Sequence, residues 1–220
     1  MKIYYEEQHS MDVFHNNVNV QALVDICLRY YNTFVFDDII GSITVKNKKL
    51  AKKFLDEAEI KYISSDYAIL FMKFKQCILN LFDSPQIKNL KGAFLEVLSF
   101  RIFKILFKPH IEAKDCRVWI DDIRSELTVD IAMEYVDSAL ICECKVPSTK
   151  YKWDIFKNLL DIKSRSLDYY NAYALTLDSQ ERMDSKKSKI KYSIDEAVNI
   201  DEVICIYRET IGDFNSFLIS

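Results

Sequence analysis

Residues 127–147 read LTVDIAMEYVDSALICECKVP, and this stretch decides the fold that we expect. Two runs rich in apolar and β-branched residues surround a polar break at residues 136–138, which is the pattern of a β-hairpin. The hairpin would close with Tyr135 opposite Ser138. We therefore expect two adjacent antiparallel strands joined by a short turn.

The charges of this hairpin suggest a functional patch. Successive side chains of a strand point to opposite faces, so Glu143 and Lys145 share one face while Cys142 and Cys144 share the other. The expected register places Asp130 directly across from Glu143. Two carboxylates and an ammonium group would then meet on one patch. A shift of one residue would move Asp130 to the other face, so the patch depends on the register.

Length and composition favour one folded domain, or one domain with a helical extension. The chain has 220 residues, half of them hydrophobic, which is enough for a large core. Only three Gly and three Pro argue against an all-β sandwich and for long helices with a compact sheet. The first ten residues lack the apolar run of a signal peptide, and no stretch approaches about 18 apolar residues. We expect a soluble, intracellular (cytoplasmic) protein that does not enter a membrane.

Charge and cysteine usage exclude several kinds of site. The net charge of −3 is not typical of a protein that coats nucleic acid by bulk electrostatics, so any such affinity must come from local patches. The six cysteines form no CxxC pair and have no neighbouring histidines, so we expect them to be reduced and mostly buried. Cys142 and Cys144 should point into the core, which disfavours a zinc or iron–sulfur site there.

Residues 1–90 are predicted to be mostly helical, because apolar residues recur every three or four positions. The expected helices span residues 18–31, 46–63 and 66–82. The second helix carries five lysines, which form either a solvated helix start or an edge that contacts phosphates: Lys46, Lys48, Lys49, Lys52 and Lys53. His9 and His15 lie in a polar, loose leader and receive no role.

A helix predicted over residues 86–108 carries an acid with no partner on the same helix. Glu96 lies away from the basic stripe of that helix, and its neighbours at three and four positions are Gly, Ala, Ser and Phe. Such a carboxylate needs compensation from outside the helix, by a metal, a lysine of the sheet or a bound water. The alternative is that Glu96 reaches solvent past Gly92.

The remaining segments predict a mixed sheet flanked by helices. A strand is expected within residues 116–120, before the hairpin. After the hairpin we expect a helix, a strand, a basic loop, a short helix opened by a capping box and a last strand, at residues 148–167, 171–177, 182–191, 193–196 and 203–207.

The hairpin patch has the chemistry of a hard divalent cation site. Asp130 and Glu143 would bind such a cation through oxygen, with the backbone carbonyl of Cys144 as a further ligand. A metal held there polarises a phosphoryl oxygen and activates a bound water, and Lys145 would orient that water or neutralise charge on the phosphorus. The sequence holds no Gly-rich phosphate loop, GxSxG motif or histidine cluster that would offer a competing chemistry.

These residues resemble the PD-(D/E)XK nuclease superfamily, which includes restriction endonucleases, Holliday junction resolvases and RecB-type nucleases. The resemblance rests on Asp130, a gap of twelve residues, then Glu143-Cys144-Lys145, with Gly92-Ala93-Phe94-Leu95-Glu96 on the upstream helix. It implies an α/β (α+β) fold. A restriction-endonuclease-like αβββαβ core with a mixed central sheet would occupy residues 86–220, preceded by an N-terminal helical region, residues 1–85.

The resemblance also implies roles for single residues. Asp130 and Glu143 would be ligands of Mg²⁺ or Mn²⁺, Lys145 the catalytic lysine, and Glu96 the helix acid that assists the metal site or its water. Val129 stands where many members have proline, which leaves the metal site intact. The lead-in to the next helix interleaves cations with aromatic rings, so it either contacts nucleic acid or is a surface helix start. The contacts expected there are Lys150, Lys152, Trp153 and Lys157.

The sequence therefore predicts a divalent-metal-dependent nuclease, with an endonuclease favoured over an exonuclease and DNA over RNA as the partner. One alternative is an RNA endonuclease of the cap-snatching type, although such enzymes often place a histidine on the upstream helix and none is near Glu96 in the sequence. Others are a catalytically inert nuclease-like interaction module, or a hairpin with ordinary exposed charges. A homodimer is an expected option, because cutting two strands takes two sites.

Overall fold

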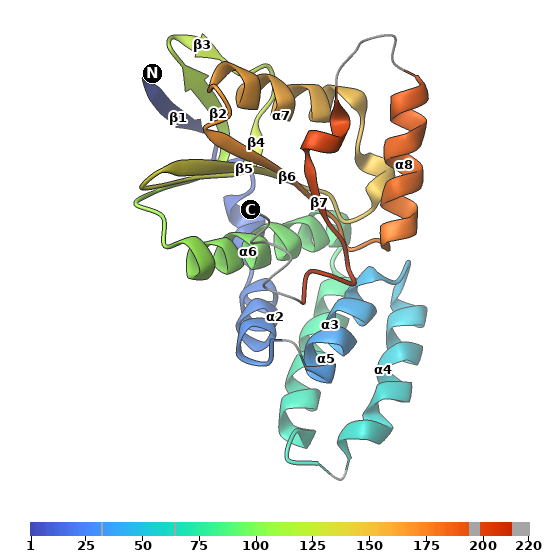
Figure 1. Ribbon diagram of the computed structural model, residues 1–220. Coiled ribbons are helices and arrows are strands. Elements are labelled where there is room, and N and C mark those ends of the chain that lie inside the picture. Colours follow the sequence, from blue (N-terminus) through green and yellow to red (C-terminus); the bar gives the residue numbers. More distant parts are fainter. Residues whose placement is uncertain (32, 64, 194–198, 213–220) are drawn as a thin grey trace. The chain divides into compact units, whose positions relative to one another are not determined.

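The computed structural model describes residues 1–31, 33–63, 65–193 and 199–212 (Figure 1). The chain divides into two compact units: a helical unit, residues 12–98, and a sheet unit made of residues 1–11 and the chain from residue 99 onward. The division predicted at residue 85 stays a prediction; in these units the first eleven residues join the sheet because β1 pairs with β2, and the second boundary falls within the helix that spans Ile87–Phe107. None of the described helices is long and apolar enough to cross a membrane.

The sheet unit contains a mixed sheet, as predicted. Its order is β1-β2-β4-β5-β6-β7, with β3 paired to β2. The pairings β1–β2, β2–β4 and β4–β5 are antiparallel. The pairings β5–β6 and β6–β7 are parallel. The strands are β1 (Ile3–Glu7), β2 (Ile111–Ile120), β3 (Ile123–Arg124), β4 (Val129–Tyr135), β5 (Ser138–Cys144), β6 (Tyr170–Leu175) and β7 (Ile204–Ile206).

The register of the β4–β5 hairpin is the predicted one. Tyr135 pairs with Ser138 and Ile131 pairs with Cys142. Continuing this register by one residue places Asp130 opposite Glu143. The turn therefore consists of two residues, and the polar break in the sequence located it correctly.

Helices cover both faces of this sheet. The helical elements of the sheet unit are the end of α6 (Ile87–Phe107), the 3₁₀ turn η1 (Ser148–Lys150), α7 (Trp153–Arg165), α8 (Gln180–Tyr192) and the 3₁₀ turn η2 (Ile200–Glu202). Figure 1 shows α6 and α7 on opposite sides of the sheet. Phe107 of α6 stacks on Tyr135 of β4 with ring centroids 5.2 Å apart. Because β4 and β5 are covered twice, both strands are nearly continuous apolar runs.

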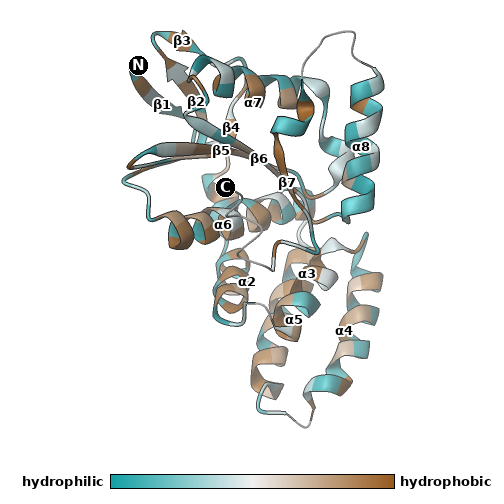
Figure 2. Cartoon of the chain, viewed as in Figure 1, coloured by the Kyte–Doolittle hydropathy of each residue, from teal (hydrophilic) through white to brown (hydrophobic). Residues whose placement is uncertain are grey.

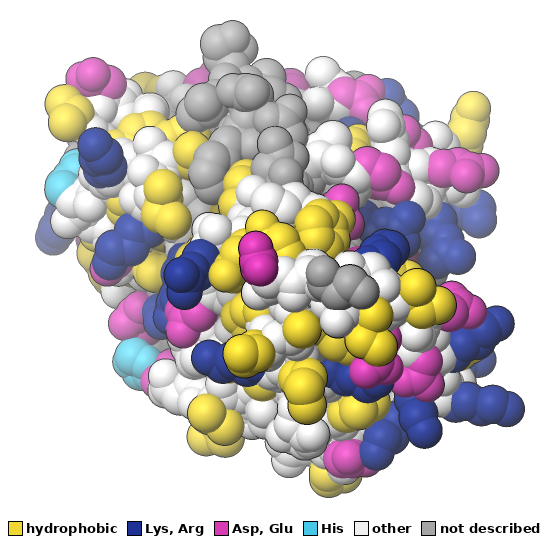
Figure 3. Space-filling model, turned by 90° about the horizontal axis from the view of Figure 1, so that it is seen from below, with side chains coloured by type: hydrophobic (Ala, Val, Ile, Leu, Met, Phe, Trp, Pro, Cys, Tyr) yellow, Lys and Arg dark blue, Asp and Glu magenta, His cyan; other side chains and the backbone are white. Residues whose placement is uncertain are grey.

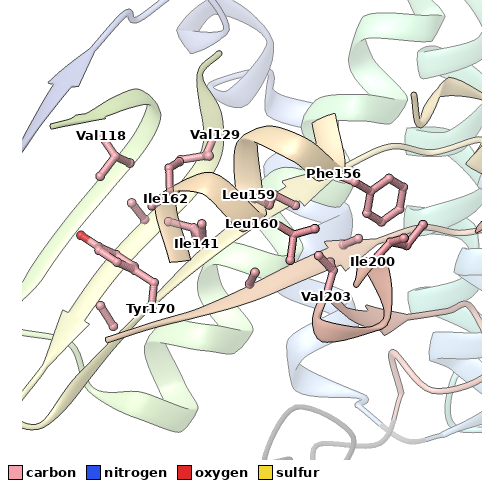
Figure 4. Close-up of a cluster of buried hydrophobic side chains, with 14 of the residues drawn as sticks. Val118, Val129, Ile141, Phe156, Leu159, Leu160, Ile162, Tyr170, Ile200 and Val203 are labelled. Atoms are coloured by element: carbon pink, nitrogen blue, oxygen red, sulfur yellow. The ribbon is translucent and has the colours of Figure 1, made fainter. Parts of the chain in front are cut away.

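The main core of the sheet unit lies between the sheet and α7 (Figure 4). Figure 4 shows Leu159 and Ile162 of α7 beside Ile141 of β5, and Phe156 of the same helix beside Ile200. Phe156, Leu159 and Ile162 are at most 1% exposed. Their spacing of three residues along α7 is the apolar stripe of a helix that buries one face. Apolar burial of this kind contributes roughly 25 cal/mol per Å² and fixes α7 beside the hairpin.

Two segments of the sheet unit differ from the prediction. Residues 182–191 were expected to be a basic loop and instead lie in α8, which Figure 2 shows as largely hydrophilic. Only Met183 and Ile190 of α8 are buried, so the apolar periodicity was too weak to indicate a helix. Residues 3–7 were expected in the helical region and instead form β1. The predicted capping box at 193–196 lies largely outside the described residues.

The helical unit confirms three predicted helices and adds two. It contains α1 (Asp12–His15), α2 (Val18–Arg29), α3 (Phe34–Thr44), α4 (Lys48–Tyr62), α5 (Ala68–Asp83) and the first part of α6. The side chain of Asn17 accepts hydrogen bonds from the first backbone N–H groups of α2, and Asn47 does the same for α4. Tyr62 stacks on Phe71 at 4.6 Å in the core. On the face in Figure 3, hydrophobic side chains lie among charged ones.

Candidate metal centre

Asp130, Glu143 and Lys145 meet at the end of the β4–β5 hairpin. Lys145 Nζ lies 3.3 Å from Asp130 Oδ2 and also contacts Glu143 Oε1. The side chains of Asp130 and Glu143 are 15% and 10% exposed, so both carboxylates are largely shielded from water. The backbone N–H of Cys144 donates to Asp130 Oδ2 at 2.6 Å, which fixes that carboxylate against β5. The structure thus brings together the three residues that the register predicted.

The two carboxylates determine the charge state of Lys145. Burial by itself would lower the pKa of Lys145, but the nearby Glu143 and Asp130 carboxylates outweigh burial and raise the pKa above its ordinary value. Lys145 is therefore an ammonium group at neutral pH. In this state it can donate hydrogen bonds and neutralise negative charge.

A buried tyrosine holds the backbone of this site. The hydroxyl of Tyr151, which is 0% exposed, lies 2.7 Å from the carbonyl oxygen of Glu143 and 2.8 Å from that of Leu175. The backbone N–H of Lys145 donates to the same Leu175 carbonyl at 2.9 Å. These bonds tie the end of β5 to β6 and to the segment after the hairpin. The sequence indicated Tyr151 only as one aromatic residue of a surface lead-in, and its burial excludes it from base stacking.

The donor set fits a hard divalent cation. Two carboxylates supply oxygen ligands, and Mg²⁺ commonly binds proteins through one or two carboxylates while keeping several waters. The ammonium group of Lys145 already lies against both carboxylates, so the site accommodates positive charge. Among the described residues no three His, Cys, Asp or Glu side chains form a metal-holding group. Any metal here would therefore be held by Asp130, Glu143, the Cys144 carbonyl and water.

A hollow of about 240 Å³ opens beside Glu143. Arg117 of β2 and Asn158 of α7 contribute to its lining, together with Thr128, which precedes β4. Sequence reasoning did not select Arg117 or Asn158, because neither belongs to a motif and both are distant from the hairpin in the sequence. Only the antiparallel pairing of β2 with β4 and the packing of α7 bring them to the site.

Comparisons with known proteins provide no family assignment. No family model and no curated protein matches the sequence. Among solved structures, the chain is similar to a protein from Vibrio cholerae described as protein VC1899, with 13% sequence identity and a TM-score of 0.45. The match covers 98% of this chain and 57% of that protein, so this chain spans little more than half of its length.

Glu96 is not the lone carboxylate that the sequence indicated. Within the helical unit, Glu96 Oε2 lies 2.6 Å from His15 Nε2, and both side chains are at most 10% exposed. The alternative that Glu96 reaches solvent past Gly92 is therefore wrong, and so is the assignment of His15 to a loose leader. Compensation from outside the helix was expected, and here it comes from His15, although α6 itself carries no histidine. The two residues are 81 positions apart, so no local pattern could predict the contact.

The residues expected to contact nucleic acid differ in their exposure to solvent. Lys150, Lys152 and Lys157 are exposed around the start of α7 and remain available to a phosphate backbone. Trp153 is half-buried and packs against the core cluster of the sheet unit, so only part of its ring could contact a base. In the helical unit, Lys48 pairs with Asp83, which reduces the positive charge of the predicted lysine edge.

The cysteines match the expectation from the sequence in part: four are buried, whereas Cys77 and Cys205 are half-buried. All six are free thiols, and Cys142 and Cys144 are buried on the opposite face of β5 from Glu143, with their sulfur atoms 3.8 Å apart. Burial raises the pKa of the Cys142 thiol, so this group is a weak metal ligand at neutral pH.

Proposed function

We propose that this protein is a divalent-metal-dependent nuclease that hydrolyses phosphodiester bonds, with DNA as the favoured substrate and endonucleolytic cleavage as the favoured mode. The observation that carries this proposal is the convergence of Asp130 and Glu143, from adjacent strands, on the ammonium group of Lys145. Two shielded carboxylates and one fixed cation are what phosphoryl transfer requires from the protein.

Each residue has a distinct task in this proposal. Asp130 and Glu143 hold Mg²⁺ or Mn²⁺ together with the carbonyl of Cys144. When bound, the metal supplies Lewis-acid polarisation of a phosphoryl oxygen and an acidified water. Lys145 donates to a phosphate oxygen on which charge accumulates, which stabilises the transition state. The resemblance implies products with 5′-phosphate and 3′-hydroxyl ends.

The order of elements supports a restriction-endonuclease-like core. The series α6, β2, β4, β5, α7, β6 follows the αβββαβ order that the resemblance implies. The proposed core keeps β3 as a small addition to β2, and β1 and β7 as strands at the two edges of the sheet. Outside the core, α1–α5 would set substrate choice, regulation or assembly.

Glu96 is proposed to assist the metal site on the strength of the resemblance alone. Its contact with His15 brings a histidine to this acid and so favours a second candidate, an RNA endonuclease of the cap-snatching type, because such enzymes often place a histidine on the upstream helix. The histidine here comes from α1 and not from the upstream helix. RNA therefore belongs in any substrate test.

The proposal is tested by incubating supercoiled, linear and branched DNA, single strands and RNA with the purified protein and Mn²⁺ or Mg²⁺. We expect cleavage by the wild type and at least a hundredfold loss in Glu143→Ala. As a matched control, Glu181→Ala removes an exposed carboxylate from α8 and should leave cleavage unchanged. If no substrate were cut, the chain would be an inert nuclease-like interaction module instead. If Glu143→Ala cut as well as the wild type, cleavage would not depend on this site and the proposal would fail. Sedimentation with and without DNA tests the proposed homodimer.

A further inference from the structure

The hollow beside Glu143 combines a cation, a hydroxyl group and an apolar wall. Its volume of about 240 Å³ is that of roughly eight water molecules, which is more than a metal and its waters alone would need. It is also smaller than a typical pocket for a drug-sized ligand. The lining residues are Arg117, Leu127, Thr128, Glu143, Ile155 and Asn158.

Arg117 is held in place without an acidic partner. Its Nη1 group donates to the carbonyl oxygen of Ser125 at 2.9 Å and also to that of Glu126. Among the described residues no carboxylate forms an ion pair with Arg117. A half-buried guanidinium that is fixed by backbone carbonyls keeps its charge and its remaining N–H donors for a ligand.

Hydrogen bonds between Asn158 and Leu127 hold another part of the lining in place. Asn158, which is 5% exposed, accepts from the backbone N–H of Leu127 at 3.0 Å and lies 3.4 Å from the carbonyl oxygen of the same residue. This double contact fixes Leu127 at the entrance of β4, three residues before Asp130. Ile155 adds a second apolar side chain from α7. The lining of the hollow thus combines two apolar side chains with the guanidinium group of Arg117.

We propose that this hollow binds the nucleotide next to the bond being cut, with Arg117 holding its phosphate. This inference rests on the proposed function. A planar guanidinium matches the geometry of phosphate oxygens, and an anion is the ligand that an unpaired cation selects. Leu127 and Ile155 contact the sugar or base of the same nucleotide. Arg117 is therefore a substrate-binding residue that lies outside the Asp130, Glu143 and Lys145 set.

The test compares how tightly the wild type and its variants bind a fluorescein-labelled 12-nucleotide DNA strand. Binding is measured by fluorescence anisotropy, with Ca²⁺ in place of Mg²⁺ to slow cleavage. We expect Arg117→Gln to bind about tenfold more weakly than the wild type. Arg124→Gln is the matched control, because Arg124 lies on the adjacent strand β3 and pairs with Glu6 at the surface. The slope of the logarithm of affinity against the logarithm of salt concentration should become shallower by about one, the value of one phosphate contact, in Arg117→Gln. It should not change in Arg124→Gln.

A further variant and a parallel cleavage assay distinguish a failure of this inference from misfolding and from a failure of the proposed function. Arg117→Lys keeps the charge but loses the planar fork, so it should bind with intermediate affinity, and it replaces Arg117→Gln if that variant unfolds. Equal binding by the Arg117 and Arg124 variants, or no binding of the strand by the wild type, would overturn the inference. Cleavage by the wild type together with equal binding leaves the proposed function intact. Binding that depends on Arg117 without any cleavage would refute the nuclease proposal, and with it the place of the nucleotide next to a cut bond, but would keep Arg117 as the phosphate contact of the hollow.

Discussion

Replacing Tyr151 with phenylalanine should weaken the fold slightly and the metal site more. The hydroxyl of Tyr151 lies within hydrogen-bond distance of two carbonyl oxygens, those of Glu143 and Leu175, but it has only one proton to donate. Burial raises the pKa of Tyr151 well above its usual value, so the hydroxyl keeps its proton at neutral pH. The phenylalanine ring occupies the same volume, so the variant creates almost no cavity.

The expected loss of stability follows from this single shared hydrogen bond. One buried neutral hydrogen bond contributes about 1 kcal/mol net. With a urea m-value of about 2 kcal/mol/M, the unfolding midpoint should fall by about 0.5 M. Tyr192→Phe makes the same chemical change at a side chain that is 93% exposed and should not move the midpoint.

The same variant should bind Mn²⁺ about tenfold more weakly by calorimetry, because it frees the peptide that carries Glu143 and precedes the Cys144 carbonyl. A loss of more than about 3 kcal/mol would mean that Tyr151 acts through packing and not through its hydroxyl. Unchanged Mn²⁺ affinity with the expected fall in midpoint would show that this backbone anchor does not support a metal site. Either result would refute the reasoning.

Three further predictions concern other buried groups. His15→Ala should lower the free energy of unfolding, measured by urea denaturation, by about 3 kcal/mol, because it leaves the buried carboxylate of Glu96 without its partner. The control His9→Ala, at an exposed site, should change it little. Burial lowers the pKa of Lys91 to about 8, so between pH 8 and 10.5 the unfolded chain binds more protons than the folded chain. The free energy of unfolding of the wild type should therefore rise across that window relative to Lys91→Gln, and a flat difference would contradict the burial of this charge. Asp130→Asn should keep the circular dichroism spectrum of the folded protein, since the amide oxygen can still accept a hydrogen bond from the backbone N–H of Cys144. It should bind Mn²⁺ at least tenfold more weakly. Unchanged affinity would show that Asp130 is not a metal ligand.

The hairpin and its patch could be predicted because the information is local. Alternation along a strand sets which side chains share a face, and a two-residue turn fixes which residues pair. Tyr135 opposite Ser138 was therefore enough to place Asp130 beside Glu143. The same alternation predicted the burial of Cys142 and Cys144.

The contacts that could not be predicted join distant parts of the chain. His15 and Glu96 are 81 residues apart, and the pairing of β1 with β2 spans more than a hundred residues. Neither contact leaves a periodic signal in the sequence. The α8 helix was missed for a different reason: it buries only Met183 and Ile190, so its apolar stripe is too sparse to stand out from a polar loop.

The central claim is that Asp130 and Glu143 share a hard divalent cation at the end of the β4–β5 hairpin. Anomalous X-ray scattering from crystals grown with Mn²⁺ tests this most directly. We expect a manganese peak about 2.1 Å from carboxylate oxygens of both residues, with Lys145 displaced from between them. A crystal that shows Lys145 still bridging the two carboxylates at saturating Mn²⁺, with no peak at the site, would contradict it.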